Sequence, residues 1–517
     1  MKTTIDVLVA MLPVVALFVG FLVFKLSAFV TSLCAFIIEL LVVLVYYRHD
    51  PLKVAAGSLW GIITIWSGFL VLYTGQIFGQ AYRSTGLLAV LLESVGSILS
   101  PDDQEAKALS LVVVIGGFIG AFNGFAVYPV AIPGLIALGF DSVQVIKAFL
   151  VYFAWPQPFV SLFIVPNISN VATHAPIPDI VRAAGFVSIP FVFISLLGFM
   201  KLLGFSFRVA RTQFLFWSMG LCNAISLVVF TQIWPEYGIM MLIGGAALSL
   251  GVLYVYGQWS KSARLVADKS LSAASLSAAA TPATQPPVFT RAMQVRAYAP
   301  LLVGVVIVLL SKTPMVAEAL EKLAFDVGLW GYKPIRVSIF TSAGFFVFLA
   351  AAVCYLFHIE RTNPLADLAI ASHRSVRSLA TLAVGSALVY LLVDTGQIQL
   401  LAEVLVSGGK FLYAALSPAM EALGGIAFGQ GLPADFLLAA MQVSVAPALG
   451  IPLAVLVGIV TVMSEGPPNP LKPTQIAYTQ SLANVEGKDG EIFRACLKWQ
   501  ILGLAVATVA AIALVYL

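Results

Sequence analysis

The sequence predicts an all-α, polytopic membrane protein. We expect about 11 to 14 transmembrane helices, in two repeats with broken helices or re-entrant hairpins. Sixty percent of the 517 residues are hydrophobic and 10% are charged, whereas an average soluble domain has roughly 25% charged residues. Apolar stretches long enough to cross a bilayer recur along the chain, and similar text appears in both halves.

Apolar runs bounded by charged residues predict the individual helices. The first run is not followed by a small-residue cleavage site, so we expect a retained helix rather than a signal peptide. Residues 124–177 and 396–480 are apolar but rich in Gly, Pro, Asn and Gln, which indicates interrupted helices. The predicted helices span residues 5–25, 28–47, 54–80, 108–123, 178–203, 213–232, 237–258, 297–311, 335–357, 378–395 and 497–517.

The chain divides into two transmembrane halves. We expect an N-terminal half over residues 1–258, with a first repeat at about 54–177, and a C-terminal half over 297–517, with a second repeat at about 378–480. Residues 259–296 are rich in Ser, Ala, Thr and Pro and carry several basic residues, which is typical of a cytoplasmic linker. The positive-inside rule also places 201–211 and 361–377 in the cytoplasm.

Composition excludes several classes of function. The net charge of +4 is small, so we expect the lipid bilayer as a partner and no nucleic acid. The four cysteines are scattered singly through apolar runs and predict neither a metal site nor a disulfide framework. No Walker A sequence or nucleophile elbow is present. We therefore expect no cofactor, no catalytic residues and no enzymatic activity.

Two short matches indicate an internal repeat. Thr74-Gly75-Gln76-Ile77 and Thr395-Gly396-Gln397-Ile398 are 321 residues apart, and each is expected to close an apolar helix. Residues 137–140 (ALGF) and 448–451 (ALGI) are 311 residues apart. Matches this short also arise by chance in an apolar sequence, but their order is preserved.

Both halves are predicted to contain a broken helix. The second offset aligns Trp155-Pro156-Gln157-Pro158 with residues 466–469, and in each half the proline cluster follows about 15 mostly apolar residues. Proline removes a backbone donor, and freed backbone groups within a membrane must line a cavity or be buried in protein. Paired interruptions are typical of a transporter binding site; the alternative is that these prolines only kink their helices.

Several segments resemble the lactate permease family. They are residues 120–132 (GAFNGFAVYPVAI), 138–140 (LGF), 438–442 (LAAMQ), 473–477 (PTQIA) and 487–494 (GKDGEIFR), in the family's order and spacing. The resemblance implies proton-coupled uptake of lactate, glycolate or a related 2-hydroxy monocarboxylate, in a fold of two inverted repeats, in a bacterial inner membrane. Counting predicted helices instead gives the two Thr-Gly-Gln-Ile segments the same orientation.

The chain also departs from the family pattern, so we expect a divergent member. The family's first signature carries a glutamate, whereas this chain has Asn123 and no carboxylate there. Residues 429–435 and 464–470 replace the family's polar runs, so the transported anion can differ from lactate.

Candidate substrate-binding residues lie at and near the two breaks. A small carboxylate needs hydrogen-bond donors and a cation, and we expect Lys472 to be the cation. The alternatives are structural hydrogen bonds for the polar side chains and snorkelling for Lys472. The polar candidates are Asn123, Tyr128, Gln157, Gln430, Gln442, Asn469 and Thr474.

Glu465 and Asp435 are the candidates for proton coupling, because they flank the second break. Glu39, Asp394, Glu403 and Glu421 lie in similar apolar surroundings and rank below them. His174 lies near two asparagines, and we interpret it as a loop residue.

Three functions follow from these patterns. The first is secondary active transport of a small organic anion by alternating access, with a proton as the coupling cation. The second is a sodium-coupled carrier or a channel for another small anion. The third is a membrane-embedded enzyme or a non-transporting subunit. The oligomeric state is left open.

Overall fold

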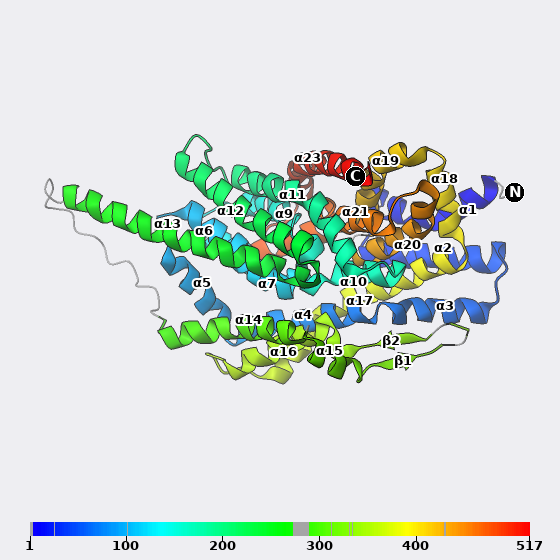
Figure 1. The fold of residues 1–517 in the computed structure, drawn as a ribbon, viewed down its shortest axis with the longest axis horizontal. Helices are drawn as coiled ribbons and strands as arrows, with labels where there is room; N and C mark the ends of the chain where they lie inside the picture. The colour runs from blue at the N-terminus through cyan, green and yellow to red at the C-terminus, as the bar shows by residue number, and fades with distance from the viewer. Residues whose placement is uncertain are drawn as a thin grey trace.

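The computed structural model describes residues 4–24, 26–100, 102–271, 289–311, 313–329, 331–332, 334–428 and 431–516. Over these residues the protein is almost entirely helical, with one two-stranded hairpin. The molecule is elongated and most of its long helices run along the long axis (Figure 1). In the described chain, nine helices are long and apolar enough to cross a membrane, or up to twelve if each bent pair is one span. The predicted polytopic all-α class is confirmed.

The N-terminal half contains thirteen α-helices with short 3-10 and π segments between some of them. The α-helices are α1 (Thr4–Phe18), α2 (Ala28–Leu41), α3 (Pro51–Thr64), α4 (Trp66–Ser84), α5 (Leu87–Ile98), α6 (Gln104–Leu109), α7 (Gly116–Phe122), α8 (Gly124–Ala137), α9 (Ser142–Phe153), α10 (Val160–Thr173), α11 (Ile177–Leu202), α12 (Ala210–Val228) and α13 (Met241–Leu271). The other segments are η1 (Val19–Val23), η2 (Val42–Tyr46), η3 (Ser110–Ile115), η4 (Gln157–Phe159), η5 (Val229–Ile233) and η6 (Pro235–Met240).

The C-terminal half contains the remaining helices and the hairpin. Its helices are α14 (Arg291–Ser311), α15 (Pro314–Glu321), α16 (Ala343–Leu356), α17 (Pro364–Asp394), α18 (Gln397–Val406), α19 (Gly409–Phe428), α20 (Gly431–Leu449), α21 (Leu453–Glu465), α22 (Pro473–Ala483) and α23 (Asp489–Tyr516). The hairpin strands are β1 (Phe325–Val327) and β2 (Ile335–Val337), and η7 (Ile339–Thr341) and η8 (Asn469–Leu471) are 3-10 turns.

Three predicted segments are corrected by the structure. The helix predicted at 335–357 begins instead as strand β2, paired antiparallel with β1, and becomes helical only at Ala343. The helix predicted at 378–395 begins at Pro364, where Asn363 caps it and proline is favourable in the first turn. Helix α13 continues to Leu271 into the predicted linker, and the centre of that linker, 272–288, lies outside the described residues.

Helices α3 and α4 pack antiparallel to α17. A Cβ on Gly57 would meet Leu391, one on Gly61 would meet Tyr390, and one on Gly68 would meet Leu382. Because positions rise along α3 and α4 as they fall along α17, the segments run in opposite directions. The predicted common orientation of the two Thr-Gly-Gln-Ile segments is therefore wrong.

The structure also changes which segments correspond. Thr74-Gly75-Gln76-Ile77 lies inside α4, whereas Thr395-Gly396 ends α17, so only the second segment closes a helix as predicted. Gly396 has a positive φ, and its counterpart 310 residues earlier is Gly86, which ends α4 in the same way. Further positive-φ pairs are Gly139 with Gly450, 311 residues apart, and His174 with Asn484, 310 apart. The helix ends in the two halves thus share one offset.

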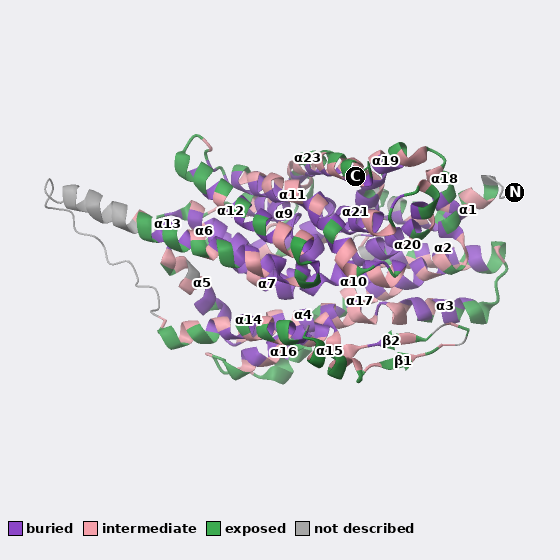
Figure 2. Ribbon diagram, viewed as in Figure 1, coloured by how far each residue is buried: buried purple, intermediate pink, exposed green. Residues whose placement is uncertain are grey.

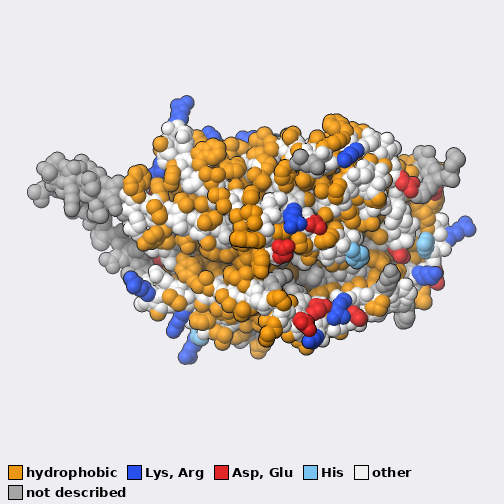
Figure 3. Space-filling view, in the orientation of Figure 1, with side chains coloured by type: hydrophobic (Ala, Val, Ile, Leu, Met, Phe, Trp, Pro, Cys, Tyr) orange, Lys and Arg blue, Asp and Glu red, His pale blue; other side chains and the backbone are white. Residues whose placement is uncertain are grey.

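The distribution of side chains suits a bilayer. Buried residues form a continuous core along the centre of the molecule, and exposed residues gather on the outer helices and the ends (Figure 2). Large apolar side chains such as Trp217, Leu221, Ile501 and Val509 are exposed on α12 and α23. Charged side chains gather toward the ends and around a hollow on the face seen in Figure 3. The apolar outer faces are those expected to contact lipid.

Candidate functional site

Both predicted helix breaks are present. Helix α9 ends at Phe153, and after the 3-10 turn η4 the chain continues as α10, with a bend of 57° between the two spans. Helix α21 ends at Glu465, and after Gly466-Pro467-Pro468 and the 3-10 turn η8 the chain continues as α22. The prolines interrupt both helices inside the buried core.

The two breaks pack against each other. A Cβ on Gly466 would lie 3.2 Å from the Ala154 carbonyl oxygen and 3.8 Å from Pro158 Cγ. Each 3-10 turn begins with an amide residue followed by proline, Gln157-Pro158 in η4 and Asn469-Pro470 in η8. The structure therefore brings corresponding parts of the two halves face to face.

Gln157 and Asn469 each leave a polar atom without a partner. Both side chains are buried, and neither Gln157 Oε1 nor Asn469 Oδ1 accepts a hydrogen bond. The Asn469 Nδ2 group donates to the Tyr128 hydroxyl at 3.1 Å. An unmet buried acceptor costs about 1–3 kcal/mol. Two of them at matching positions indicate a site for a ligand that donates hydrogen bonds.

The first break also stores backbone strain. Ser161, Leu162 and Phe163 have left-handed backbone angles, with φ of 54°, 52° and 63°, at a cost of roughly 1–2 kcal/mol per residue. Ser161 Oγ accepts a hydrogen bond from the Gly124 N–H at 3.1 Å, and Asn167 donates to the Phe163 carbonyl at 2.6 Å. These contacts hold the turn against the start of α8. Such strain is concentrated at functional sites.

A buried ion pair lies at the second break. Lys472 Nζ and Glu465 Oε2 are 3.0 Å apart, and their side chains are only 1% and 5% exposed. Glu465 packs so closely on Gly431 that a Cβ there would lie within 2.0 Å of the carboxyl group. A buried ion pair contributes little net stability, because both charges lose their hydration. Ionisable groups inside a membrane are functional candidates for that reason.

A second buried carboxylate lies beside this pair. Asp435 accepts hydrogen bonds from Ser169 Oγ at 2.6 Å and from Ser464 Oγ at 3.3 Å. Ser169 is also 3.0 Å from the hydroxyl of Thr461. Because Ser464 directly precedes Glu465, one turn of α21 links the two carboxylates.

Tyr128 belongs to an aromatic cluster under the second break. Its ring contacts Phe149 and Phe153 edge-on, with centroids 4.9 and 5.1 Å away, and it lies 5.6 Å from the ring of Tyr478. The hydroxyl that Asn469 contacts is therefore held in a fixed position.

The other predicted residues are placed differently. Asn123 caps α8 and donates to the Gly75 carbonyl oxygen, so its amide closes the break between α7 and α8. Gln442 bonds the Tyr413 hydroxyl at 2.6 Å and the Leu438 carbonyl at 3.1 Å, two turns along α20 from Asp435. Thr474 borders a cavity beyond the second break. Gln430 lies outside the described residues.

Two cavities approach the breaks. The larger, which we name the hairpin cavity, has a volume of about 1060 Å³ and is bordered by α10, η6 and the β1–β2 hairpin. It opens into the hollow of Figure 3. At its mouth, burial and the carboxylate of Asp394 raise the pKa of Tyr332 to about 12, so this phenol stays protonated.

The smaller cavity, of about 730 Å³, lies between α4, α17 and α22 and is bordered by Arg83, Arg374 and Arg377. We name it the arginine cavity. On α4, Val71 borders the hairpin cavity and Gln76 the arginine cavity, which leaves a partition of about 7 Å along the helix.

Sequence reasoning missed several of these groups. Ser169, Thr461 and Ser464 gave no signal, because hydroxyl residues in apolar helices commonly bond their own backbone. Arg374 and Arg377 were assigned to a loop and lie in α17. The spacing of Arg374 and Arg377, three residues apart in an apolar helix, was the one available sign of a shared face.

A helical membrane protein with two opposed helix breaks, a buried ion pair between them and cavities on both sides has the architecture of a secondary transporter. The comparison with protein families agrees: the profile of the L-lactate permease family matches residues 6–517. The chain belongs to this family. No curated protein matches it in a sequence search.

Family membership supports a lactate transporter rather than an enzyme, with a small organic anion as its substrate. Together with the many apolar helices, it supports a multi-pass membrane protein.

Proposed function

We propose that the protein is a proton-coupled symporter of lactate or a closely related 2-hydroxy monocarboxylate. The observation that carries this proposal is the buried Lys472–Glu465 ion pair at the junction of the two breaks. Lys472 is the group best suited to bind a carboxylate there. In the described structure Glu465 already occupies it.

This competition provides the coupling. When a proton binds Glu465, its charge is lost and the attraction to Lys472 weakens, so Lys472 is free to pair with the substrate carboxylate. One proton on Glu465 and one anion on Lys472 leave the net charge of the site unchanged. Asp435, linked through Ser464, is the neighbouring group that exchanges the proton with Glu465.

The two unmet amide oxygens suit the rest of the substrate. Gln157 Oε1 and Asn469 Oδ1 are acceptors, and the 2-hydroxyl group of lactate is a donor. A substrate hydroxyl between the two turns would relieve the cost of at least one buried acceptor. Tyr128 positions Asn469 for this contact.

The two cavities support alternating access. We propose that a first repeat at about 54–177 and a second at about 378–480, within halves 1–258 and 297–517, rock about the paired breaks and open one cavity at a time. The basic segments at one end place the arginine cavity on the cytoplasmic side, with the protein in the bacterial inner membrane.

A sodium-coupled carrier is the second candidate. It is favoured by Asp435, whose carboxylate lies among the hydroxyl groups of Ser169, Thr461 and Ser464. Oxygen ligands of this kind suit a hard cation.

Purified protein in liposomes separates these functions. A proton gradient and a sodium gradient are imposed separately while uptake of labelled lactate is followed. We expect a pH gradient, acid outside, to drive lactate above equilibrium, and a sodium gradient at constant pH to have no effect. Accumulation driven only by sodium, or no transport of any short carboxylate in a panel that includes glycolate and propionate, would overturn the proposal.

A further inference from the structure

The arginine cavity carries a strong positive charge that the central site does not use. Arg83 on α4 and Arg374 and Arg377 on α17 border it, together with neutral groups such as Gln76, Gln80 and Thr381. Among the described residues, no Asp or Glu borders the cavity. An enclosed region with one sign of charge concentrates ions of the opposite sign.

One of these arginines is held in place by a built network. Arg374 donates to Gln80 Oε1 at 3.0 Å, and Gln80 Nε2 donates to Asp367 Oδ1 at 2.9 Å. Asp367 is buried and also accepts hydrogen bonds from Ser84, Tyr355 and Thr362. The Gln80 contact uses one N–H of the guanidinium, which has five. Arg374 is thus fixed in position through a neutral side chain and keeps donors available for a ligand.

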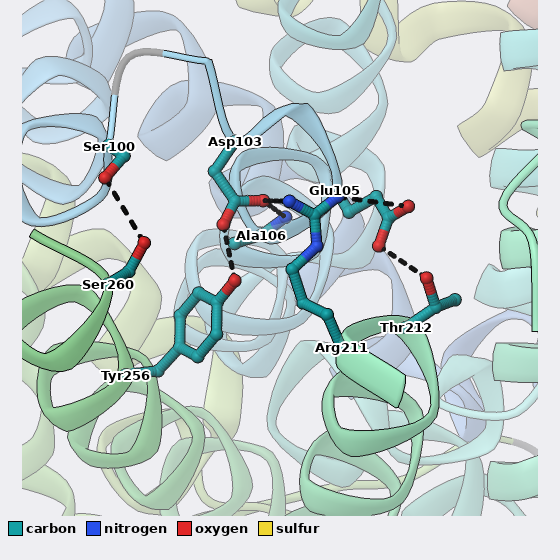
Figure 4. A network of polar contacts seen from close by, with 8 residues as sticks. All are labelled: Ser100, Asp103, Glu105, Ala106, Arg211, Thr212, Tyr256 and Ser260. Carbon is teal, nitrogen blue, oxygen red and sulfur yellow. Dashed lines mark hydrogen bonds and ion pairs between the residues drawn. The ribbon is translucent and has the colours of Figure 1, made fainter. Parts of the chain in front are cut away.

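The arginines are also close enough to repel. Arg83 lies within electrostatic range of Arg374, and both act on the hydroxyl group of Tyr478. Arg211, at the same end of the molecule, shows the contrasting arrangement in Figure 4: its guanidinium lies 3.9 Å from Asp103 and 3.4 Å from Glu105. Arginines that serve only to orient the chain in the membrane need no cavity free of acids.

The cavity ends close to the central site. Tyr478 borders the cavity, and its ring lies 5.6 Å from that of Tyr128. The Tyr128 hydroxyl in turn contacts Asn469 at 3.1 Å. A single layer of aromatic side chains therefore separates the arginines from the second break.

We propose that Arg83, Arg374 and Arg377 form a second anion-binding site, which takes a small monocarboxylate on the cytoplasmic side of the partition. Guanidinium groups bind carboxylates through paired hydrogen bonds. The site lowers the energy of the anion as it leaves Lys472 and sets the affinity of the inward-facing state. The identity of the carboxylate rests on the proposed transport function, whereas the anion site itself does not.

The anion site is tested without transport. Ser378 borders the cavity, so a Ser378→Cys variant, with the exposed Cys34 replaced by Ala, is labelled from the cytoplasmic face with a negatively charged and a positively charged thiol reagent of equal size. We expect Arg374→Gln with Arg377→Gln to lower the negative-to-positive rate ratio about tenfold. Arg208→Gln, an exposed arginine outside the cavity, should leave it unchanged. An equal ratio in the double variant would overturn the site; Arg377→Gln alone serves if the double variant does not fold.

Transport then tests the ligand. In liposomes of known orientation, the double variant should raise the half-saturating lactate concentration on the cytoplasmic face about tenfold and change the outer value less than twofold. Equal shifts on both faces, or none, would contradict the assignment to the inward-facing state. If the protein moves no lactate at all, the labelling ratio still reports the site, so failure of the proposed function is distinguished from failure of this inference.

Discussion

At the first break the chain turns through Trp155-Pro156-Gln157-Pro158 and carries no charged side chain; at the second it turns through Gly466-Pro467-Pro468-Asn469 between Glu465 and Lys472. Both turns are 3-10 and both bury an amide with an unmet oxygen. What they share is the geometry expected of a substrate site, and what differs is charge. The comparison teaches that the neutral break supplies shape and hydrogen bonding, while the charged break supplies coupling.

The largest effect is expected from removing the cation of the charged break. Lys472→Gln should lower lactate transport at least about a hundredfold, because the anion loses its only buried cation and Glu465 is left unpaired, a loss of about 3–5 kcal/mol. Initial rates in liposomes measure it. Lys147→Gln, which breaks a partly exposed pair with Glu491, should change transport less than about twofold.

Stability measurements keep this prediction interpretable. Lys472→Met combined with Glu465→Gln should recover most of the thermal stability lost by Lys472→Met alone, without recovering transport. Full transport by either Lys472 variant would show that the two breaks do not differ in function.

A smaller effect is expected at Asp435, which adjoins the charged break. Asp435→Asn keeps acceptor and donor atoms for Ser169 and Ser464 but cannot carry a proton. Proton-driven net uptake should fall about tenfold, and lactate exchange at equal pH should fall less, because exchange needs no net proton movement. An equal fall in both rates would place Asp435 in the structure of the site rather than in coupling.

The shared feature of the breaks gives the next prediction. Gln157→Leu and Asn469→Leu should each reduce the preference for lactate over propionate, which lacks the hydroxyl group, by about 1–2 kcal/mol, or roughly five- to thirtyfold. The ratio of half-saturating concentrations measures this. A loss of both substrates in equal proportion would mean that the amides do not contact the hydroxyl.

The smallest effect is expected away from both breaks. Gln442→Leu removes the contact with Tyr413 and should lower the unfolding free energy by about 1 kcal/mol, while the half-saturating lactate concentration stays unchanged. Thermal unfolding in detergent measures the first quantity, with Tyr413→Phe as the matched variant. A large change in lactate affinity would extend the site along α20.

Membrane location, helical class and the position of both breaks were predictable from the sequence, because each depends on local composition: apolar length for the spans, proline clusters for the breaks. The hairpin at β1–β2 was not, because a stretch such as Ile335–Val337 is equally apolar in a strand and in a helix. The repeat was found with the wrong anchor, since Thr74-Gly75 repeats the letters of Thr395-Gly396 but Gly86 repeats its backbone angle.

The site was predictable only in part. Lys472 and Glu465 stood out because charge is rare in apolar text, and the structure places them in contact. The roles of the predicted residues remain proposals. Gln442 and Asn123 are the same residue types as the ligand-facing candidates, but their hydrogen bonds are fixed by partners distant in sequence, Tyr413 and Gly75. The pairing of polar groups across helices depends on tertiary packing.

The central claim is that the Glu465–Lys472 pair links one proton to one anion. Glu465→Gln tests it most directly, since glutamine resembles the protonated acid and should leave Lys472 free to bind lactate. Two rates are measured in the same liposomes: exchange of labelled lactate at equal pH, and net uptake driven by a pH gradient. We predict that exchange persists within about tenfold of the unmodified protein while gradient-driven accumulation is lost. Accumulation above equilibrium by Glu465→Gln would contradict the claim.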